Sequence, residues 1–260
     1  MSYTYTSHFA KDLVIYTEYL YKQKKNIRST TNLLKAFDRY CVEINFHGKL
    51  TQDLVIEYSQ RGSVSLMTQG GRYRAIRDFY RFCAILDDSL PKIMDMPIAG
   101  KKLRHNAYIY TDAEILKLMT SPAQTMPWDK ALLVRWQCLL GLMACTGIRI
   151  GEALNLNIDD IDWKEKTLFI QNSKFGKSRI IPVHSSLLKA FSIYLQYRIS
   201  PADPECKALF ISRKGGRCHC STIEMLFRKI ATKAKVGEGK QPIPRIHDLR
   251  HTFAIRTILT

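Results

Sequence analysis

Two distant stretches of the sequence carry side chains that can act together on a phosphate group. One reads Thr-Gly-Ile-Arg-Ile-Gly-Glu-Ala-Leu at 146–154, and the other reads Pro-Arg-Ile-His-Asp-Leu-Arg-His-Thr-Phe at 244–253. In a helix, His247 and Arg250 lie three positions apart and so share one face. A guanidinium is a planar fork of donors that fits two oxygens of a phosphate. Arg149 and Arg250 together can therefore clamp both non-bridging oxygens of a phosphodiester.

These two motifs, in this order and separated by a strand-rich segment that contains a lysine, resemble the tyrosine recombinase (phage integrase) family. The hallmark of that family is an arginine, a lysine on a β-hairpin, a His-x-x-Arg box, a second His or Trp, and a tyrosine nucleophile. The resemblance is close from about Tyr110 to the end of the sequence, and it extends to the N-terminal part only in architecture. The sequence departs from the family's pattern by ending at Thr260, before the second His or Trp and the tyrosine.

The resemblance implies a site that transesterifies a DNA phosphodiester through a covalent 3′-phosphotyrosine. Arg149 and Arg250 would offset the charge that builds on the pentacoordinate phosphorane. Lys174 matches the family's hairpin lysine and would protonate the leaving 5′-oxygen, while His247 would assist proton transfer near the nucleophile. Glu152 would orient Arg149 or His247. Because the arginines supply the positive charge, no metal ion and no cofactor is expected.

Two assignments within this pattern stay open. Lys177 and Arg179 are the alternatives to Lys174 at the hairpin. A lysine at a hairpin tip is often only solvated, although loops carry functional residues more often than most sites do. His251 is expected to be a packed or capping histidine, because a histidine beside a satisfied motif usually packs.

No tyrosine of this sequence matches the family's nucleophile, because all of them precede the His-x-x-Arg box. The last four are Tyr108, Tyr110, Tyr194 and Tyr197. We therefore expect either a fragment of a longer enzyme or a naturally shortened member of the family. The abrupt end inside an apolar helical pattern favours truncation. We expect no strand cleavage by this 260-residue chain. One alternative is a DNA-binding accessory or decoy protein without cleavage. Another is an RNA- or DNA-binding protein unrelated to recombination, which requires both arginine motifs to arise by coincidence.

The composition limits the class of protein. With 260 residues and 46% apolar content, the chain can form one large domain or two ordinary ones with a real core. Its 40 Lys and Arg residues against 23 Asp and Glu give a formal charge of +17, which favours a polyanionic partner, most simply DNA or RNA, over a merely basic soluble protein. No apolar run approaches the ~20 residues of a membrane span, and the N-terminus lacks a signal-peptide pattern.

Seven scattered cysteines suit a reducing cytosol better than a disulfide framework. The run Cys218-His219-Cys220 suggests a metal site, but no second ligand pair with finger-like spacing accompanies it, so zinc is not expected. The resemblance implies double-stranded DNA as the partner and a tetrameric synapse on DNA when the protein is full length. It also implies a cytoplasmic, nucleoid-associated protein of prokaryotic, phage or mobile-element origin, and the lack of a long apolar run implies no membrane association.

Four helices are predicted in the N-terminal part. Apolar residues recur at three- and four-residue steps in two helices between Phe9 and Ile44, and the Ser/Thr group at 29–31 can cap the second. A third short helix starts at Leu50, and the fourth covers 63–86. The fourth carries a row of arginines beside an aromatic core stripe, as expected of a helical domain that lies against a duplex.

Prolines and glycines at 91–100 break the periodicity, and a basic run continues this break to His105. We therefore predict a helical core-binding, DNA-binding domain at 1–90, a linker at 91–107 and an α+β catalytic domain at 108–260. The expected fold class is mainly α with a small antiparallel β-sheet.

The catalytic domain must hold Arg149 and the hairpin lysine in place. A buried helix over 128–146 ends just before Arg149, so the arginine would sit rigidly at a helix junction. β-prone runs at 158–163, 167–171 and 179–183 predict a three-stranded antiparallel sheet with Lys174 at a hairpin tip. Further helices are predicted from Thr111 onward, at 185–197, at 222–234 and at the end of the sequence.

The basic turn at 213–217 is either a DNA-backbone contact or a plain glycine-rich hairpin turn. The residues expected to contact DNA are Arg72, Arg74, Arg77, Arg81, Lys177, Arg179, Arg213 and Lys214.

Overall fold

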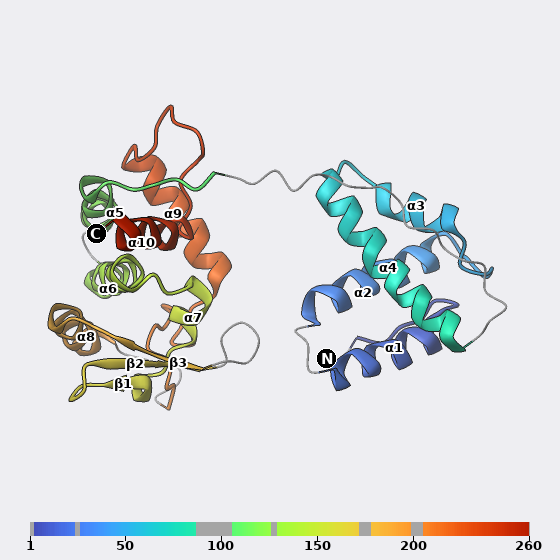
Figure 1. The fold of residues 1–260 in the computed structure, drawn as a ribbon, viewed down its shortest axis with the longest axis horizontal. Helices are drawn as coiled ribbons and strands as arrows, with labels where there is room; N and C mark the ends of the chain where they lie inside the picture. The colour runs from blue at the N-terminus through green and yellow to red at the C-terminus, as the bar shows by residue number, and fades with distance from the viewer. Residues whose placement is uncertain are drawn as a thin grey trace. The chain divides into compact units, whose positions relative to one another are not determined.

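The computed structural model describes residues 3–23, 27–86, 106–125, 129–171, 178–198 and 205–259. Contacts between Cα atoms divide the chain into two compact units, 1–104 and 105–260. Each unit has a hydrophobic core of its own. The predicted linker at 91–107 lies outside the described residues except for its last two positions. The prediction of a mainly helical chain with a small antiparallel sheet is confirmed (Figure 1).

The described part of the first unit holds four helices packed around apolar and aromatic side chains. They are α1 (Ala10–Lys22), α2 (Arg28–Glu43), α3 (Gln52–Gln60) and α4 (Leu66–Leu86). Leu13, Leu34, Phe37 and Ile76 from three of these helices are fully buried. The three- and four-residue spacing of the apolar positions therefore becomes one inward face per helix.

The start of α2 differs from the prediction that the Ser/Thr group caps it. The N-cap position is Ile27, which has no side chain able to accept a hydrogen bond. Thr31 instead donates its hydroxyl to the carbonyl oxygens of Ile27 and Arg28, at 3.1 Å each. The capping prediction was wrong because the helix begins earlier, and the threonine falls within its first turn, where a hydroxyl bonds back to the preceding carbonyls.

The second unit combines helices with a three-stranded sheet. Its elements are α5 (Asp112–Thr125), α6 (Lys130–Thr146), α7 (Ile150–Asn155), the 3-10 helix η1 (Ile158–Asp160), β1 (Ile161–Asp162), β2 (Thr167–Ile170), β3 (Arg179–Pro182), α8 (Ser185–Tyr197), α9 (Cys220–Lys233) and α10 (Asp248–Leu259). The strands follow the order β1-β2-β3 and are antiparallel. The run at 158–163 was predicted as strand, but its first three residues form η1, where the Asp160 carboxylate accepts the N–H of Asn157 at 2.8 Å.

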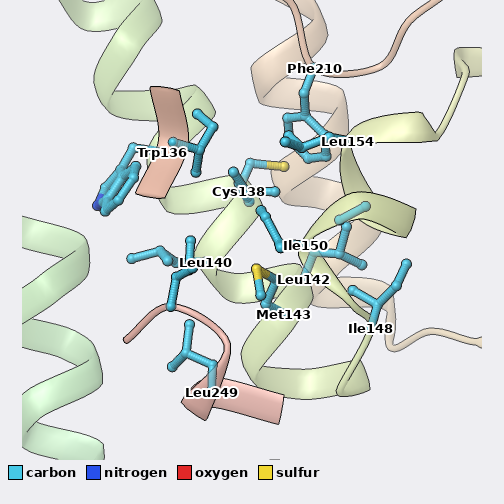
Figure 2. Packing of buried hydrophobic residues seen from close by; sticks show 14 of the residues in the cluster. Trp136, Cys138, Leu140, Leu142, Met143, Ile148, Ile150, Leu154, Phe210 and Leu249 are labelled. Carbon is cyan, nitrogen blue, oxygen red and sulfur yellow. The ribbon is translucent and has the colours of Figure 1, made fainter. Parts of the chain in front are cut away.

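Helix α6 is the centre of the second unit and contacts α5, α7, α8 and α10. It starts at a cap in which the Asp129 carboxylate accepts the N–H of Leu132 at 2.8 Å. Figure 2 shows Trp136 and Leu140 leaving the helix on one side and Cys138 lying on the side of Phe210. Burial on several sides fixes α6, so its C-terminal end can hold a site in a defined place.

The beginning of the second unit is bonded to its last described helix. The N–H of Tyr110 donates to the hydroxyl of Thr252 at 3.0 Å, and the Tyr110 hydroxyl donates to the carbonyl of Arg245 at 2.8 Å. Arg256 donates to the carbonyl of Tyr110 at 3.0 Å. Tyr110 itself is 1% exposed. These bonds hold α10 and the residues just before it against the segment that precedes α5.

Candidate active site

The end of α6 forms a tight junction with α10. Gly147 caps α6 in the left-handed conformation, with φ of 61°, which residues with a Cβ adopt at a cost. A Cβ on this glycine would also lie 2.3 Å from Cδ1 of Phe253. The Arg250 guanidinium donates to the Gly147 carbonyl oxygen. The glycine therefore allows α10 to approach so closely that Arg250 reaches the loop that carries Arg149.

Arg149 is held by Glu152 at the start of α7. Glu152 accepts the main-chain N–H of Arg149 at 3.1 Å and its Nη1 at 2.8 Å. The same carboxylate accepts both terminal nitrogens of Arg179 on β3, at 3.2 and 2.7 Å. The side chain of Glu152 is 9% exposed, whereas those of Arg149 and Arg179 are 38% and 34% exposed. A buried carboxylate thus orients two arginines whose guanidinium groups still reach solvent.

The electrostatics of Glu152 follow from these bonds. Burial alone raises the pKa of the carboxyl group, but the hydrogen bonds from Arg179 and Arg149 outweigh burial and lower the pKa to about 2. The bond to Glu152 in turn raises the pKa of Arg179. Glu152 is therefore ionised throughout the physiological range and keeps both arginines in place.

His247 and Arg250 lie in a positive environment. Partial burial lowers the pKa of His247, and the charges of His251, Arg250 and Arg149 lower it further, against an opposing contribution from the carboxylate of Asp248. Burial also lowers the pKa of Arg250, with a further contribution from the charge of Arg149. These electrostatic couplings join Arg149, His247 and Arg250 in one cluster. At neutral pH the imidazole is uncharged and able to accept a proton.

His251 lies beside His247 rather than in the core. The two rings are 5.8 Å apart, centre to centre, in an edge-to-face arrangement, and His251 is exposed. The expectation of a packed histidine was wrong, because none of the described residues of the unit buries the face of α10 that carries His251. Asp248, at the start of the same helix, is buried, and its carboxylate accepts the main-chain N–H of Arg245 at 3.0 Å.

The cluster can bind an anion with two guanidinium groups and present an imidazole beside it. A tetrahedral phosphate with two free oxygens fits this set of donors. Lys174 and Lys177 lie outside the described residues, so the assignment of the hairpin lysine stays a prediction. Arg179 was assigned to DNA contact, and that role also stays a prediction. Its bidentate bond to Glu152 was not foreseen.

The remaining predicted DNA contacts lie on the surfaces of the two units. On α4, Arg72 donates to the carbonyl of Arg61 at 2.6 Å, and Arg77 bonds to Asp78 at 2.8 Å. Arg74 and Arg81, also on α4, are exposed. In the second unit the side chain of Arg213 is 81% exposed with Asp129 3.7 Å away, and Lys214 is exposed in the same turn.

The three-residue spacing of Arg149 and Glu152 was a local signal for the bond between them, but no such signal indicated the bond from Arg179 on β3 to Glu152. The described residues hold no group of three or more His, Cys, Asp or Glu side chains that could bind a metal ion. Within the same residues, no helix has the length and apolar character needed to cross a membrane.

The chain is similar in sequence to a known protein family and to several named proteins. Residues 109–258 match the phage integrase family. The chain is 31% identical over 243 residues to y4rB of Sinorhizobium fredii, named as an integrase/recombinase, covering 90% of this chain and 76% of that protein. It is 30% identical over 189 residues to the tyrosine recombinase XerD of Mycobacterium leprae, covering 69% of this chain and 57% of that one.

Solved structures share the fold. The Tn1549 transposon integrase in complex with circular intermediate DNA aligns with a TM-score of 0.65 at 18% identity, over 95% of this chain and 87% of that chain. The XerH site-specific recombinase bound to difH substrate, in a pre-cleavage complex, aligns with a TM-score of 0.64 at 18% identity, over 90% and 68% of the two chains.

Proposed function

The chain belongs to the phage integrase family of tyrosine recombinases, and we propose that its second unit binds a phosphodiester of double-stranded DNA between Arg149 and Arg250 for site-specific strand exchange. The observation that carries this proposal is the junction at Gly147, which brings Arg250 to the loop before Arg149. Relatives named as recombinases and integrases, and structural neighbours solved with DNA, support the choice of DNA over RNA.

The residue roles follow from the chemistry of the cluster. Arg149 and Arg250 stabilise the charge of the pentacoordinate phosphorane, and their fixed positions avoid a reorganisation cost when that charge develops. His247, neutral at physiological pH, exchanges a proton near the attacking oxygen. Glu152 acts through Arg149 and is therefore a positioning residue. Lys174 acts as the general acid toward the leaving 5′-oxygen.

The covalent step needs a tyrosine that the sequence given does not contain after its His-x-x-Arg box. Positioned arginines cannot replace the bond that a nucleophile makes. We propose that this 260-residue chain binds DNA without forming a phosphotyrosine, and that a chain continuing through the family's His or Trp and Tyr cleaves. DNA binding without cleavage, as in an accessory or decoy protein, is the second candidate function.

The first unit is proposed to be the core-binding domain and to contact the duplex through the arginines of α4. We also propose that the protein self-associates on DNA and acts at the nucleoid. The whole chain carries a formal charge of +17, which favours association with a polyanion.

The test uses the 260-residue chain with a random duplex of about 30 base pairs. Binding is expected to weaken steeply with salt, because phosphate contacts release counterions, and removal of residues 1–100 is expected to weaken it further. A nicked suicide substrate is expected to yield no adduct that survives denaturation. Equal affinity at low and high salt would contradict DNA binding through phosphates. A phosphotyrosine adduct from this chain alone would overturn the assignment of the nucleophile to residues outside it.

A further inference from the structure

The outer face of the small sheet carries apolar side chains where polar ones are expected. Along β2, Leu168 and Ile170 point into the core, with exposed fractions of 0% and 2%, while Phe169 points outward and is 43% exposed. Its partner across the ladder, Ile180 on β3, is 65% exposed. An antiparallel sheet with one face in water normally places polar residues on that face. Phe169 and Ile180 instead form one apolar strip, because paired side chains in neighbouring strands lie ~5 Å apart.

A tryptophan extends the strip. Trp163 lies in the turn after β1 and is 42% exposed. The turn is fixed by Asp162, whose carboxylate accepts the N–H groups of Lys164 at 3.0 Å and Glu165 at 2.8 Å. Trp163 lines a hollow of about 530 Å³ together with Phe169 and Ile180. Single exposed apolar residues are ordinary on a protein surface, but several gathered on one hollow mark an interaction surface.

The charge of this hollow is opposite to that of the chain. Its lining holds three carboxylates against one ammonium group, that of Lys164, whereas the whole chain has a formal charge of +17. Asp160 is buried and already accepts the side-chain N–H of Gln171 at 2.9 Å. Asp159 and Asp162 are exposed. Asp159 lies 3.7 Å from Lys207 with both side chains 75% exposed, and an ion pair of this kind contributes little and exchanges readily.

We propose that this outer sheet face, made of Trp163, Phe169 and Ile180 with Asp159 and Asp162 at its edge, docks a cationic protein segment with bulky apolar side chains. The aromatic and aliphatic side chains supply area to bury, and the carboxylates select positive charge at the rim. The ring of Trp163 also attracts a guanidinium. Carboxylates repel DNA phosphates, so this face serves a protein partner and lies outside the DNA-binding surface proposed above.

The test uses the 260-residue chain and a fluorescein-labelled peptide of alternating arginine and leucine. Binding is measured by fluorescence anisotropy at physiological salt. The double variant Phe169→Ser/Ile180→Ser and the single variant Asp159→Lys are each expected to weaken binding at least tenfold. Matched controls change an exposed apolar residue and an exposed acid elsewhere in the same unit, as Ile193→Ser and Glu224→Lys, and are expected to stay within twofold of the unaltered chain.

Two further measurements locate the peptide and check the fold. Peptide binding is expected to shift the tryptophan emission of the unaltered chain but not that of a Trp163→Phe variant. Circular dichroism and duplex DNA affinity are expected to stay unchanged in the double variant. The proposal is overturned if the peptide does not bind, if the controls weaken binding as much as the face variants, or if a peptide of alternating glutamate and leucine binds with the same dependence on the face.

Discussion

The arginines of α4 and Arg250, which lies beside Gly147, are held in different ways. On α4, Arg77 bonds to the adjacent Asp78, and Arg72 bonds to the carbonyl of Arg61, 11 positions earlier. In the second unit, Arg250 bonds to a carbonyl 103 positions earlier in the chain. A surface arginine can adjust to the backbone of a duplex, whereas an arginine that must meet a transition state has to be fixed before the charge develops.

The difference predicts where a substitution takes effect. A change at the fixed site alters the free energy of unfolding, because its bonds join separate elements of the unit. A change in the α4 row alters the salt dependence of DNA binding and leaves the fold intact.

The largest effect is expected for Gly147→Ala. The substitution forces a Cβ against Phe253 and places alanine at a φ of 61°. Overpacking costs about 1–3 kcal/mol and the left-handed conformation about 1–2 kcal/mol, so we expect a loss of about 3–4 kcal/mol in the free energy of unfolding, measured by urea denaturation. DNA affinity is expected to fall with it, because Arg149 and Arg250 lose their common support.

Gly239→Ala is the matched control for that change. Gly239 lies in the same unit with a φ of 69°, but nothing lies within 4 Å of the position of a Cβ. Its substitution should cost only about 1–2 kcal/mol, the backbone contribution alone. Equal losses in the two variants would mean that the approach of Phe253 plays no part.

A smaller effect is expected for Glu152→Gln. The neutral amide cannot accept the hydrogen bonds of Arg149 and Arg179 as the carboxylate does, so both arginines lose their counter-charge. Breaking a fully buried pair costs about 3–5 kcal/mol. Because both arginines are one-third exposed, we expect a loss of about 2–3 kcal/mol. Asp112→Asn, which removes a partner of Arg256 at a site where the Asp112 side chain is 90% exposed, should cost less than about 1 kcal/mol.

The stabilising effect of Glu152 should depend on pH. Its pKa in the folded chain is lowered to about 2 from an ordinary value of 4.5. The contribution is therefore complete above pH 4.5 and lost as the pH falls toward 2. The difference in unfolding free energy between the unaltered chain and Glu152→Gln should shrink over this range. A difference that is constant with pH would show that the charge of Glu152 is not its source.

The smallest effect on the fold is expected for Arg74→Gln on α4. Stability should change by less than about 0.5 kcal/mol, as for most surface substitutions. The slope of the logarithm of the DNA association constant against that of salt should become shallower by about 0.9, the contribution of one phosphate contact. Arg39→Gln, an exposed arginine of α2, removes the same charge and should leave the slope unchanged if α4 alone faces the duplex.

Periodicity in the sequence was enough to predict most elements. The predicted helix at 185–197 has the same bounds in the structure, and the strands at 167–171 and 179–183 differ by one residue each. The local signals are strong there, because apolar residues recur with the period of the element. The cap of α2 was missed because the helix begins at Arg28, so that Thr31 lies inside its first turn rather than at its cap.

The contacts of the site also differ in how far the sequence could predict them. The family resemblance implied that Glu152 orients Arg149 or His247, and in the structure Glu152 bonds to Arg149. The bond from Arg179 to Glu152 depends on where β3 lies against α7, and the bond from Arg250 depends on the approach of α10 to Gly147. Neither relation is local, so no motif or periodicity in one segment could reveal it.

The bonds between Tyr110 and the α10 region also bear on the order in which the protein is made. The first unit needs only residues before 105 and can fold while the ribosome is still translating the second. Tyr110 must wait for Arg245, Thr252 and Arg256, the last of them 146 positions later. During synthesis the segment around Tyr110 therefore cannot form these bonds until α10 has left the exit tunnel, although it is the first part of the second unit to be translated.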